Sequence, residues 1–291
     1  IRPLAIGKKE TESGTDYIVA SETTTLDYLG YENCYQLSKG EMAFVDKDKK
    51  LHLDTGENKR QSLCVFEYIY FAREDSVIHG RLVAKERHKL GRALAGQFRA
   101  RGLRPDIVID VPSSAYFCAQ GLSEALEVPY QRGFIKNRHI GRSFIASTQK
   151  VRELIVRQKL NPIKEFVEGK KIAVVDDSIV RGTTSKHIVS LLREKGAQEV
   201  YFVSASPPLK YPCPYGIDIS SRKEMIASNH SIDSICQFIG ADALIYPDLD
   251  DLRESFDKRS HCDACFSSDY PTHMTKESLN QIELEKIRAG R

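Results

Sequence analysis

Two adjacent acids, Asp176 and Asp177, stand between a run of four apolar residues and a short loop. The apolar run, residues 172–175, is typical of a strand that is buried on both faces in a parallel sheet. Carboxylates at such a strand end can accept hydrogen bonds from sugar hydroxyls or hold a divalent cation, directly or through water. The acidic pair is therefore a candidate site for a sugar or a metal ion.

The loop after the acids leads into a predicted helix that runs from residue 183 to about 195 and ends at Gly196. The amino end of a helix offers unpaired N–H groups and a positive dipole end, which favour a phosphate group. A ribose with a 5′-phosphate would satisfy the acids and this helix end together. The spacing is not that of a P-loop, and the plain alternative is a strand end with a helix cap. The candidate binding residues are Asp176, Asp177, Ser178, Arg181, Gly182, Thr183, Thr184 and Ser185.

The stretch Val174-Val-Asp-Asp-Ser-Ile-Val-Arg-Gly-Thr-Thr-Ser185 resembles the loop that binds phosphoribosyl diphosphate (PRPP) in type I phosphoribosyltransferases. Its form is similar to that of the glutamine PRPP amidotransferase (amidophosphoribosyltransferase) family. The resemblance implies that Asp176 and Asp177 hold ribose hydroxyls and a hydrated Mg²⁺. It also implies that residues 181–185 surround the 5′-phosphate, mainly through backbone N–H groups.

A basic stretch at 130–150 shows little periodicity and contains two glycines. By charge alone it could be a solvated loop, a disordered segment or a functional lid. The string Lys136-Asn-Arg-His-Ile-Gly-Arg-Ser-Phe-Ile145 resembles the flexible loop that closes over PRPP in the family. The resemblance implies that Lys136, Arg138 and Arg142 hold the leaving diphosphate. A basic helix is predicted at 151–160.

Seven cysteines at irregular spacings do not indicate a disulfide scaffold. The single Cys-x-x-Cys pair, Cys262 and Cys265, is a weak metal signal, because buried apolar thiols are common. The contexts of Cys64, Cys213, Cys262 and Cys265 resemble those of the four ligands that hold a [4Fe–4S] cluster in one branch of the family. Four thiolates suit either such a cluster or tetrahedral zinc, and the resemblance favours the cluster, in a structural role.

The other cysteines and histidines receive no functional role from the sequence. Cys118 and Cys236 fall in predicted helices and are expected to be core residues, while Cys34 has no assigned role. His139 and His261 are expected to be solvated loop residues.

Strand and helix patterns alternate through the middle of the chain, which predicts an α/β fold with a parallel sheet covered by helices. Helices are expected at 84–101, 115–126 and 183–195, and strands at 106–111, 171–176 and 199–205. The resemblance implies the type I phosphoribosyltransferase fold, with ligands at the carboxyl ends of the strands.

Residues 1–56 contain only short strand-like runs, and they resemble the end of an N-terminal-nucleophile glutaminase domain. The expected division is a remnant of a class II glutamine amidotransferase domain at 1–60, a phosphoribosyltransferase domain at 61–255 and a cysteine-containing tail with a helix at 256–291. The aromatic-rich run from Leu63 to Phe71 is expected to be a strand between the first two parts.

Composition narrows the classes of partner. A net charge of +3 on 291 residues gives no basis for a nucleic-acid or membrane surface. The sequence has no apolar run of membrane-spanning length and no signal-peptide pattern, so a cytoplasmic protein is expected. The chain begins with Ile1, whereas the family's glutaminase uses a cysteine at its mature N-terminus, so glutaminase activity is not expected from this chain.

The family resemblance implies an enzyme that forms 5-phosphoribosylamine and diphosphate from PRPP and glutamine-derived ammonia, the first committed step of de novo purine biosynthesis. This chain would carry the PRPP half, with ammonia, or glutamine through a missing domain, as co-substrate. Purine nucleotides would be feedback inhibitors of a homo-oligomer. The alternatives are a non-catalytic PRPP-binding regulatory module of the same fold and an inactive fragment with an exposed sheet edge.

One turn departs from the family pattern. Members have a sequence of the kind Val-Pro-Asp-Ser-Ser after the strand at 106–111, and its last serine helps to hold the metal. This chain has Val111-Pro-Ser-Ser-Ala115 instead, so Ala115 offers no oxygen. Ser114 is therefore the candidate that would replace it as a ligand of Mg²⁺.

Overall fold

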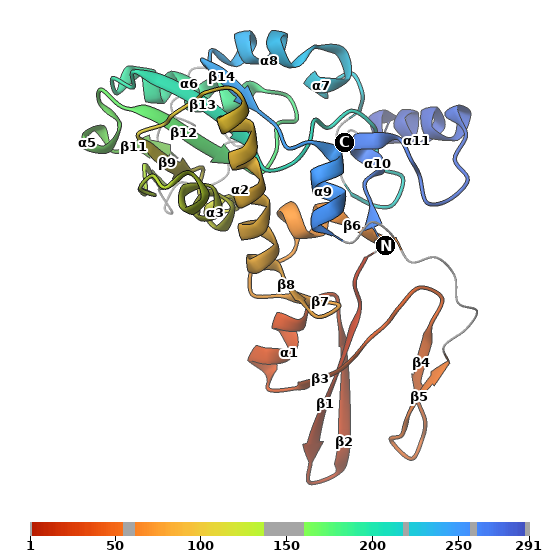
Figure 1. Ribbon diagram of the computed structural model, residues 1–291. Helices are drawn as coiled ribbons and strands as arrows, with labels where there is room; N and C mark the ends of the chain where they lie inside the picture. The colour runs from red at the N-terminus through yellow and green to blue at the C-terminus, as the bar shows by residue number, and fades with distance from the viewer. Residues whose placement is uncertain (1, 55–61, 137–159, 218–220, 257–260, 289–291) are drawn as a thin grey trace, which may run out of the picture. The chain divides into compact units, whose positions relative to one another are not determined.

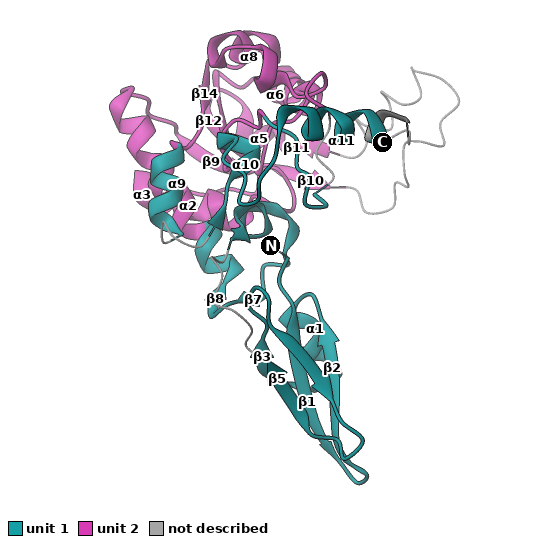
Figure 2. Ribbon diagram, turned by 90° about the vertical axis from the view of Figure 1, so that its right-hand side faces the viewer, with its two compact units in different colours: residues 1–87, 211–219, 249–291 teal, residues 88–210, 220–248 magenta. Residues whose placement is uncertain are grey.

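The computed structural model describes residues 2–54, 62–136, 160–217, 221–256 and 261–288 (Figure 1). The chain divides into two compact units, each made of separate stretches of sequence (Figure 2). The first unit contains residues 1–87, 211–219 and 249–291, and the second contains residues 88–210 and 220–248.

A four-stranded parallel sheet forms the centre of the second unit, in the order β14-β13-β12-β9 (Figure 1). Its strands are β9 (Ile107–Asp110), β12 (Lys171–Asp176), β13 (Glu199–Ser204) and β14 (Ala243–Ile245). In the register of the sheet, Val175 lies opposite Asp110 and Asp176 lies opposite Ser204. The carboxyl ends of parallel strands meet at one edge, so the polar residues that end β9, β12 and β13 share that edge.

Helices cover both faces of this sheet (Figure 1). Apolar residues of α6 (Thr183–Glu194) and α8 (Ile232–Ile239) pack with alternate strand residues such as Val174 and Phe202 in one core. On the other face, Phe98 of α2 (Val83–Ala100) makes an edge contact with Tyr201, with ring centroids 6.1 Å apart. The helix α3 (Tyr116–Leu126) lies on β9 and β12. The remaining elements are α5 (Lys164–Val167), α7 (Ile226–Asn229) and the antiparallel pair β10 (Phe134–Lys136) and β11 (Leu160–Pro162).

Two glycines allow α2 and α3 to cross in backbone contact. A Cβ atom on Gly91 would lie 1.9 Å from the carbonyl oxygen of Cys118, and one on Gly121 would lie 2.0 Å from that of His88. No side chain larger than hydrogen fits either place without moving a helix. The crossing fixes α3, and with it the turn at Ser114 that precedes the helix.

The first unit is rich in short antiparallel pairs. A three-stranded sheet has the order β2-β1-β3, and two further hairpins follow it. The elements are β1 (Ala5–Thr11), β2 (Gly14–Ala20), α1 (Thr23–Leu29), β3 (Glu32–Gln36), β4 (Met42–Val45), β5 (Leu51–Asp54), β7 (Val77–Ile78) and β8 (Arg81–Leu82). The sequence predicted strands in this region but missed α1. Three consecutive threonines disfavour a helix, whereas burial of Leu26 against Gly7 stabilises it.

The last part of the chain returns to the first unit. The two-residue strands β6 (Leu63–Cys64) and β15 (His261–Cys262) pair in parallel, so Cys64 lies directly beside Cys262. The helices of this part are α9 (Leu249–Ser255), α10 (Ala264–Ser267) and α11 (Lys276–Arg288). His261 was expected to lie in a solvated loop, and this expectation is wrong. The residue lies in β15 and packs against the rings of Tyr68 and Phe256.

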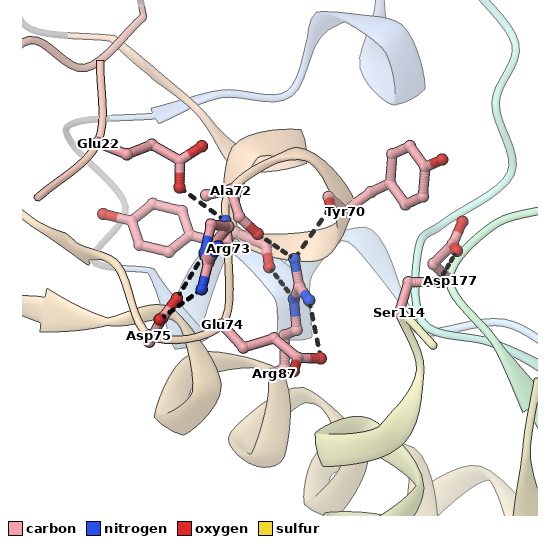
Figure 3. A network of polar contacts seen from close by, with 10 residues as sticks. Glu22, Tyr70, Ala72, Arg73, Glu74, Asp75, Arg87, Ser114 and Asp177 are labelled. Carbon is pink, nitrogen blue, oxygen red and sulfur yellow. Dashed lines mark hydrogen bonds and ion pairs between the residues drawn. The ribbon is translucent and has the colours of Figure 1, made fainter. Parts of the chain in front are cut away.

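The prediction of a strand from Leu63 to Phe71 is wrong beyond Cys64, because residues 67–71 form one turn of π-helix, η1 (Glu67–Phe71). The buried guanidinium of Arg87 donates hydrogen bonds to the carbonyls of Tyr68, Tyr70 and Ala72, over 2.8 to 3.0 Å (Figure 3). Carbonyls at the end of a helical turn otherwise lack partners. A side chain nearly twenty residues away therefore stabilises η1, and no local pattern reveals it.

The predicted α/β fold is confirmed: the strands and helices expected between residues 84 and 205 are present with ends shifted by one or two residues. Cys118 is buried in α3, as expected, and Cys236 is half-buried in α8. The helix predicted at 151–160 falls outside the described residues except for Leu160, which is in β11. No helix in the described part of the chain combines the length and apolar character that a bilayer crossing requires.

Candidate functional site

Asp176 ends β12 and Asp177 follows it, and the carboxylates of both acids accept hydrogen bonds from neighbouring groups. Asp177 accepts a hydrogen bond from the hydroxyl of Ser114, which lies after β9 (Figure 3). It accepts another, of 2.6 Å, from the hydroxyl of Ser178. The backbone N–H of Asp177 donates to Oδ1 of Asp176 over 3.0 Å. Because Ser114 and Ser178 bind different oxygens of Asp177, they fix the plane of its carboxylate at the edge of the sheet.

Asp176 is almost fully buried, with 8% of its surface exposed. Burial, and next the adjacent Asp177 carboxylate, raises the pKa of Asp176 well above its usual value, against the smaller effect of its backbone hydrogen bond. A second negative charge so close is costly without a cation or hydrogen-bond donors nearby. The acidic pair therefore favours a ligand that brings positive charge or hydroxyl donors.

The loop after the acids turns into α6 at Gly182, whose φ of +74° lies in the left-handed region. A Cβ atom there would lie 3.0 Å from Ile226 and 3.2 Å from Phe238, so glycine is favoured twice, by backbone angle and by space. In the first turn of α6, Thr183 and Thr184 are exposed, whereas Ser185 is buried. The exposed threonines and the first N–H groups of the helix are suitable donors for an anion.

The structure describes some of the predicted basic residues and not others. Arg181 is half-exposed and pairs with Glu224, with 2.5 Å between Nη2 and Oε1. Lys136 is exposed at the end of β10. Arg138, Arg142 and His139 lie outside the described residues. Among the described residues, the structure brings together the acids, Ser114 and the loop to Ser185.

A buried acid at the same edge of the sheet was not among the predicted residues. Asp110, 5% exposed, ends β9 and accepts a hydrogen bond of 2.8 Å from the hydroxyl of Tyr130. Burial, and next this hydrogen bond, raises the pKa of Tyr130. A carboxylate that interrupts an apolar strand at its carboxyl end is a sequence signal that could have identified Asp110.

The four predicted cluster cysteines line one cavity in the first unit. Its walls also include aromatic and apolar side chains, and the complete lining is Cys64, Phe66, Cys213, Pro214, Tyr215, Ile217, Cys262, Ala264, Cys265 and Tyr270. The pairing of β6 with β15 places Cys64 beside Cys262, and the N–H of Tyr211 donates to the carbonyl of Cys265 over 3.1 Å. All seven cysteines are free thiols.

Burial makes three of these thiols, those of Cys64, Cys262 and Cys265, favour the protonated form. Burial raises the pKa of Cys64 to about 12 and also raises the pKa values of Cys262 and Cys265. Within the described residues, no three His, Cys, Asp or Glu side chains are placed to hold a single metal ion. A tetrahedral zinc site needs four sulfurs about 2.3 Å from one point, whereas the ligands of a [4Fe–4S] cluster bind different irons.

Comparisons with known proteins agree with this fold. Residues 82–210 match the family model of the phosphoribosyl transferase domain. The chain is 41% identical over 95% of its length to the amidophosphoribosyltransferase of Methanothermobacter thermautotrophicus, of which it covers 57%. It is 41% identical over 96% of its length to that of Bacillus subtilis, of which it covers 58%.

A solved structure gives the same result. The glutamine PRPP amidotransferase from B. subtilis, complexed with ADP and GMP, matches 97% of this chain with a TM-score of 0.85 and 41% identity. The match covers 62% of that chain, so the protein described here spans less than two thirds of the length of these relatives.

Residues 82–210 are therefore a phosphoribosyltransferase domain of type I, built on a parallel sheet with helices on both faces. Over the part of the relatives' length that it spans, the chain belongs to the amidophosphoribosyltransferase family.

Proposed function

We propose that this chain carries the PRPP-binding part of an amidophosphoribosyltransferase. Ammonia would attack C1 of PRPP, the bond from C1 to the diphosphate oxygen would break, and 5-phosphoribosylamine and diphosphate would be released after loss of a proton. In the whole protein, glutamine would supply the ammonia in the first committed step of de novo purine biosynthesis. The observation that supports this proposal is a pair of hydrogen-bonded acids at the end of β12, Asp176 and Asp177, which lie seven and six residues before the first residue of α6.

The two halves of this site suit the two ends of a ribose phosphate. Asp176 and Asp177 would accept hydrogen bonds from ribose hydroxyls, since ionised carboxylates are acceptors only. Residues 181–185 would surround the 5′-phosphate, with backbone N–H groups and the hydroxyls of Thr183 and Thr184 as donors. Ser178 already donates to Asp177, so its role would be to orient that carboxylate.

The same oxygens fit Mg²⁺, which prefers carboxylate, hydroxyl and water ligands. Asp176 and Asp177 bring two carboxylates into one place, and Ser114 adds a hydroxyl from the turn after β9. Mg²⁺ bound there would neutralise the negative charge of the acids and of the diphosphate. Ala115 cannot contribute an oxygen, so we propose that Ser114 takes that place.

Departure of diphosphate from an anomeric carbon favours a transition state in which the sugar ring carries positive charge. The residues of this chain then need to orient the ribose and stabilise the departing anion. Lys136 at the end of β10 is the described residue that we propose for the second task. The matching roles of Arg138 and Arg142 stay predictions.

We further propose a [4Fe–4S] cluster bound by Cys64, Cys213, Cys262 and Cys265. In support, these thiols line one cavity, although they come from three distant parts of the sequence. A cluster there would connect residues 262–265 to the rest of the first unit, and its role would be structural.

The proposed function also implies how the whole protein is regulated and assembled. A relative of this chain was solved in complex with ADP and GMP, so we propose that purine nucleotides inhibit the whole protein. A homo-oligomer, a cytoplasmic location and the division into parts at 1–60, 61–255 and 256–291 stay predictions.

The test is release of diphosphate from PRPP by the 291-residue chain with Mg²⁺ and ammonium ions. We expect release that depends on all three components and is lost when Asp176 and Asp177 are both replaced by asparagine. Binding of PRPP by that double variant with unchanged affinity would refute the assigned roles.

The second candidate is a regulatory module that binds PRPP without turning it over. The observation that favours it is Ala115, since it removes an oxygen from the metal site. Mg²⁺-dependent binding of PRPP without any diphosphate release would support the module over the enzyme. A chain that neither binds PRPP nor releases diphosphate would contradict both.

A further inference from the structure

Both cations at the amino end of α6 are held by side chains from one later segment, residues 224–238. The carboxylate of Glu224 pairs with the guanidinium of Arg181 over 2.5 Å. The ammonium of Lys186 lies over the ring of Phe238, 4.8 Å from its centroid. Neither Glu224 nor Phe238 belongs to the loop motif of residues 176–185.

The same segment also contacts the backbone of the loop. The N–H of Ile226 donates a hydrogen bond of 2.8 Å to the carbonyl of Val180. The side chains of Ile226 and Phe238 lie so near Gly182 that an added Cβ atom would be 3.0 to 3.3 Å from them. Residues 224–238 thus contact the backbone of the loop between the acids and α6. They also contact the side chains of Arg181 and Lys186.

These two contacts contribute little to the stability of the folded chain. The side chains of Arg181 and Glu224 are 56% and 39% exposed, and ion pairs of this kind contribute little to the free energy of unfolding. A cation over an exposed aromatic ring is similarly weak. Both contacts restrict where a positive charge lies at the end of the helix that attracts an anion.

We propose that Glu224 and Phe238 are positioning residues that orient Arg181 and Lys186 toward the phosphate of the substrate. This inference rests on the proposed function and assigns it two residues outside the loop motif. Orientation before binding lowers the entropic cost of ordering these long side chains when the anion arrives.

The experiment measures the affinity of the 291-residue chain for PRPP with Mg²⁺ by calorimetry. Replacing Glu224 by Gln keeps the shape and removes the charge, and we expect about fivefold weaker binding, the ratio that corresponds to one oriented ionic contact. Because Glu224 acts through Arg181, the double variant E224Q/R181A should bind no more weakly than R181A. Phe238→Leu, which keeps an apolar side chain but removes the ring, should weaken binding less.

The matched control is Glu168→Gln, which removes an exposed ion pair with Lys164 (3.1 Å) in the same unit and should leave the affinity unchanged. Equal thermal midpoints of E224Q and E168Q would show that the weaker binding of E224Q does not come from a less stable fold. Unchanged affinity of E224Q, or losses in E224Q and R181A that add in the double variant, would overturn this inference alone. An unsubstituted chain that does not bind PRPP would overturn the proposed function and this inference with it.

Discussion

The hydroxyl of Ser114 donates a hydrogen bond to Oδ2 of Asp177, and the two residues are 63 positions apart in the chain (Figure 3). The bond joins the turn after β9 to the end of β12, two strands that are neighbours in the sheet. Together with the bond from Ser178 it leaves the Asp177 carboxylate with one orientation. This pairing places the predicted metal oxygens of the two strands in one site.

Replacing Ser114 by Ala should weaken Mg²⁺-dependent binding of PRPP about tenfold, because a hydrogen bond to a charged group contributes about 1.5–3 kcal/mol. The loss should be partly reversed at high Mg²⁺ concentration, since the cation can orient the carboxylate in place of the hydroxyl. Titration of PRPP binding at several Mg²⁺ concentrations measures both effects.

The control for this variant is Ser190→Ala, which removes a hydroxyl that donates to Glu194 on the exposed face of α6. Its affinity for PRPP should equal that of the unsubstituted chain. A Ser114→Ala chain that binds PRPP as tightly at low Mg²⁺ as the unsubstituted chain would remove Ser114 from the metal site.

Asp176→Asn should make the unliganded chain more stable and bind PRPP at least roughly tenfold more weakly. The carboxylate is buried beside a second carboxylate, and an amide of the same shape removes this repulsion while Oδ1 can still accept the N–H of Asp177. Active-site acids often reduce stability in this way. Thermal unfolding without ligand and calorimetry with PRPP test the two effects, and a lower thermal midpoint in the variant would contradict the prediction.

The sequence was sufficient for the elements that local patterns determine. The apolar runs of β9, β12 and β13, and the helical spacing of Leu90, Leu94 and Phe98, reflect burial on a sheet or on one helix face. The loop at residues 176–185 could be identified because its residue types are chemically specific and adjacent.

Contacts between distant parts of the sequence could not be predicted in this way. The turn η1 depends on Arg87, which lies on another helix, and the buried Asp110 depends on the hydroxyl of Tyr130. Glu224 follows no motif and pairs with Arg181 only because the chain folds back onto the loop. Such pairs have no period along the sequence, so hydrophobic patterns carry no information about them.

The cysteine cavity predicts a definite metal content. Anaerobic reconstitution of the chain with iron and sulfide should yield about four irons and four sulfides per chain, as a cubane cluster requires. Replacing Cys262 by Ser should reduce the iron content strongly, because its neighbour Cys64 comes from a paired strand and both line the cavity. Removal of the metal should lower the thermal midpoint of the first unit.

The matched control is Cys34→Ser, which changes a thiol in the same unit that donates to the carbonyl of Ile6 and lies outside the cavity. Its iron content should stay that of the unsubstituted chain. One zinc per chain, with no sulfide, would contradict the cluster and indicate a tetrahedral zinc site instead.

His79 should make the stability of the first unit depend on pH. Partial burial lowers the pKa of this histidine below its usual value, although Glu41 opposes the effect. The unfolded chain then binds the proton more readily than the folded one, so stability should fall as pH drops from about 6.5 through the lower folded pKa. His79→Asn should flatten this part of the curve, and asparagine tolerates the φ of +44° found at this position.

Thermal midpoints between pH 5 and 8 measure the effect, with the exposed His273→Asn as control. A variant that keeps the full pH dependence of the unsubstituted chain would assign it to another group.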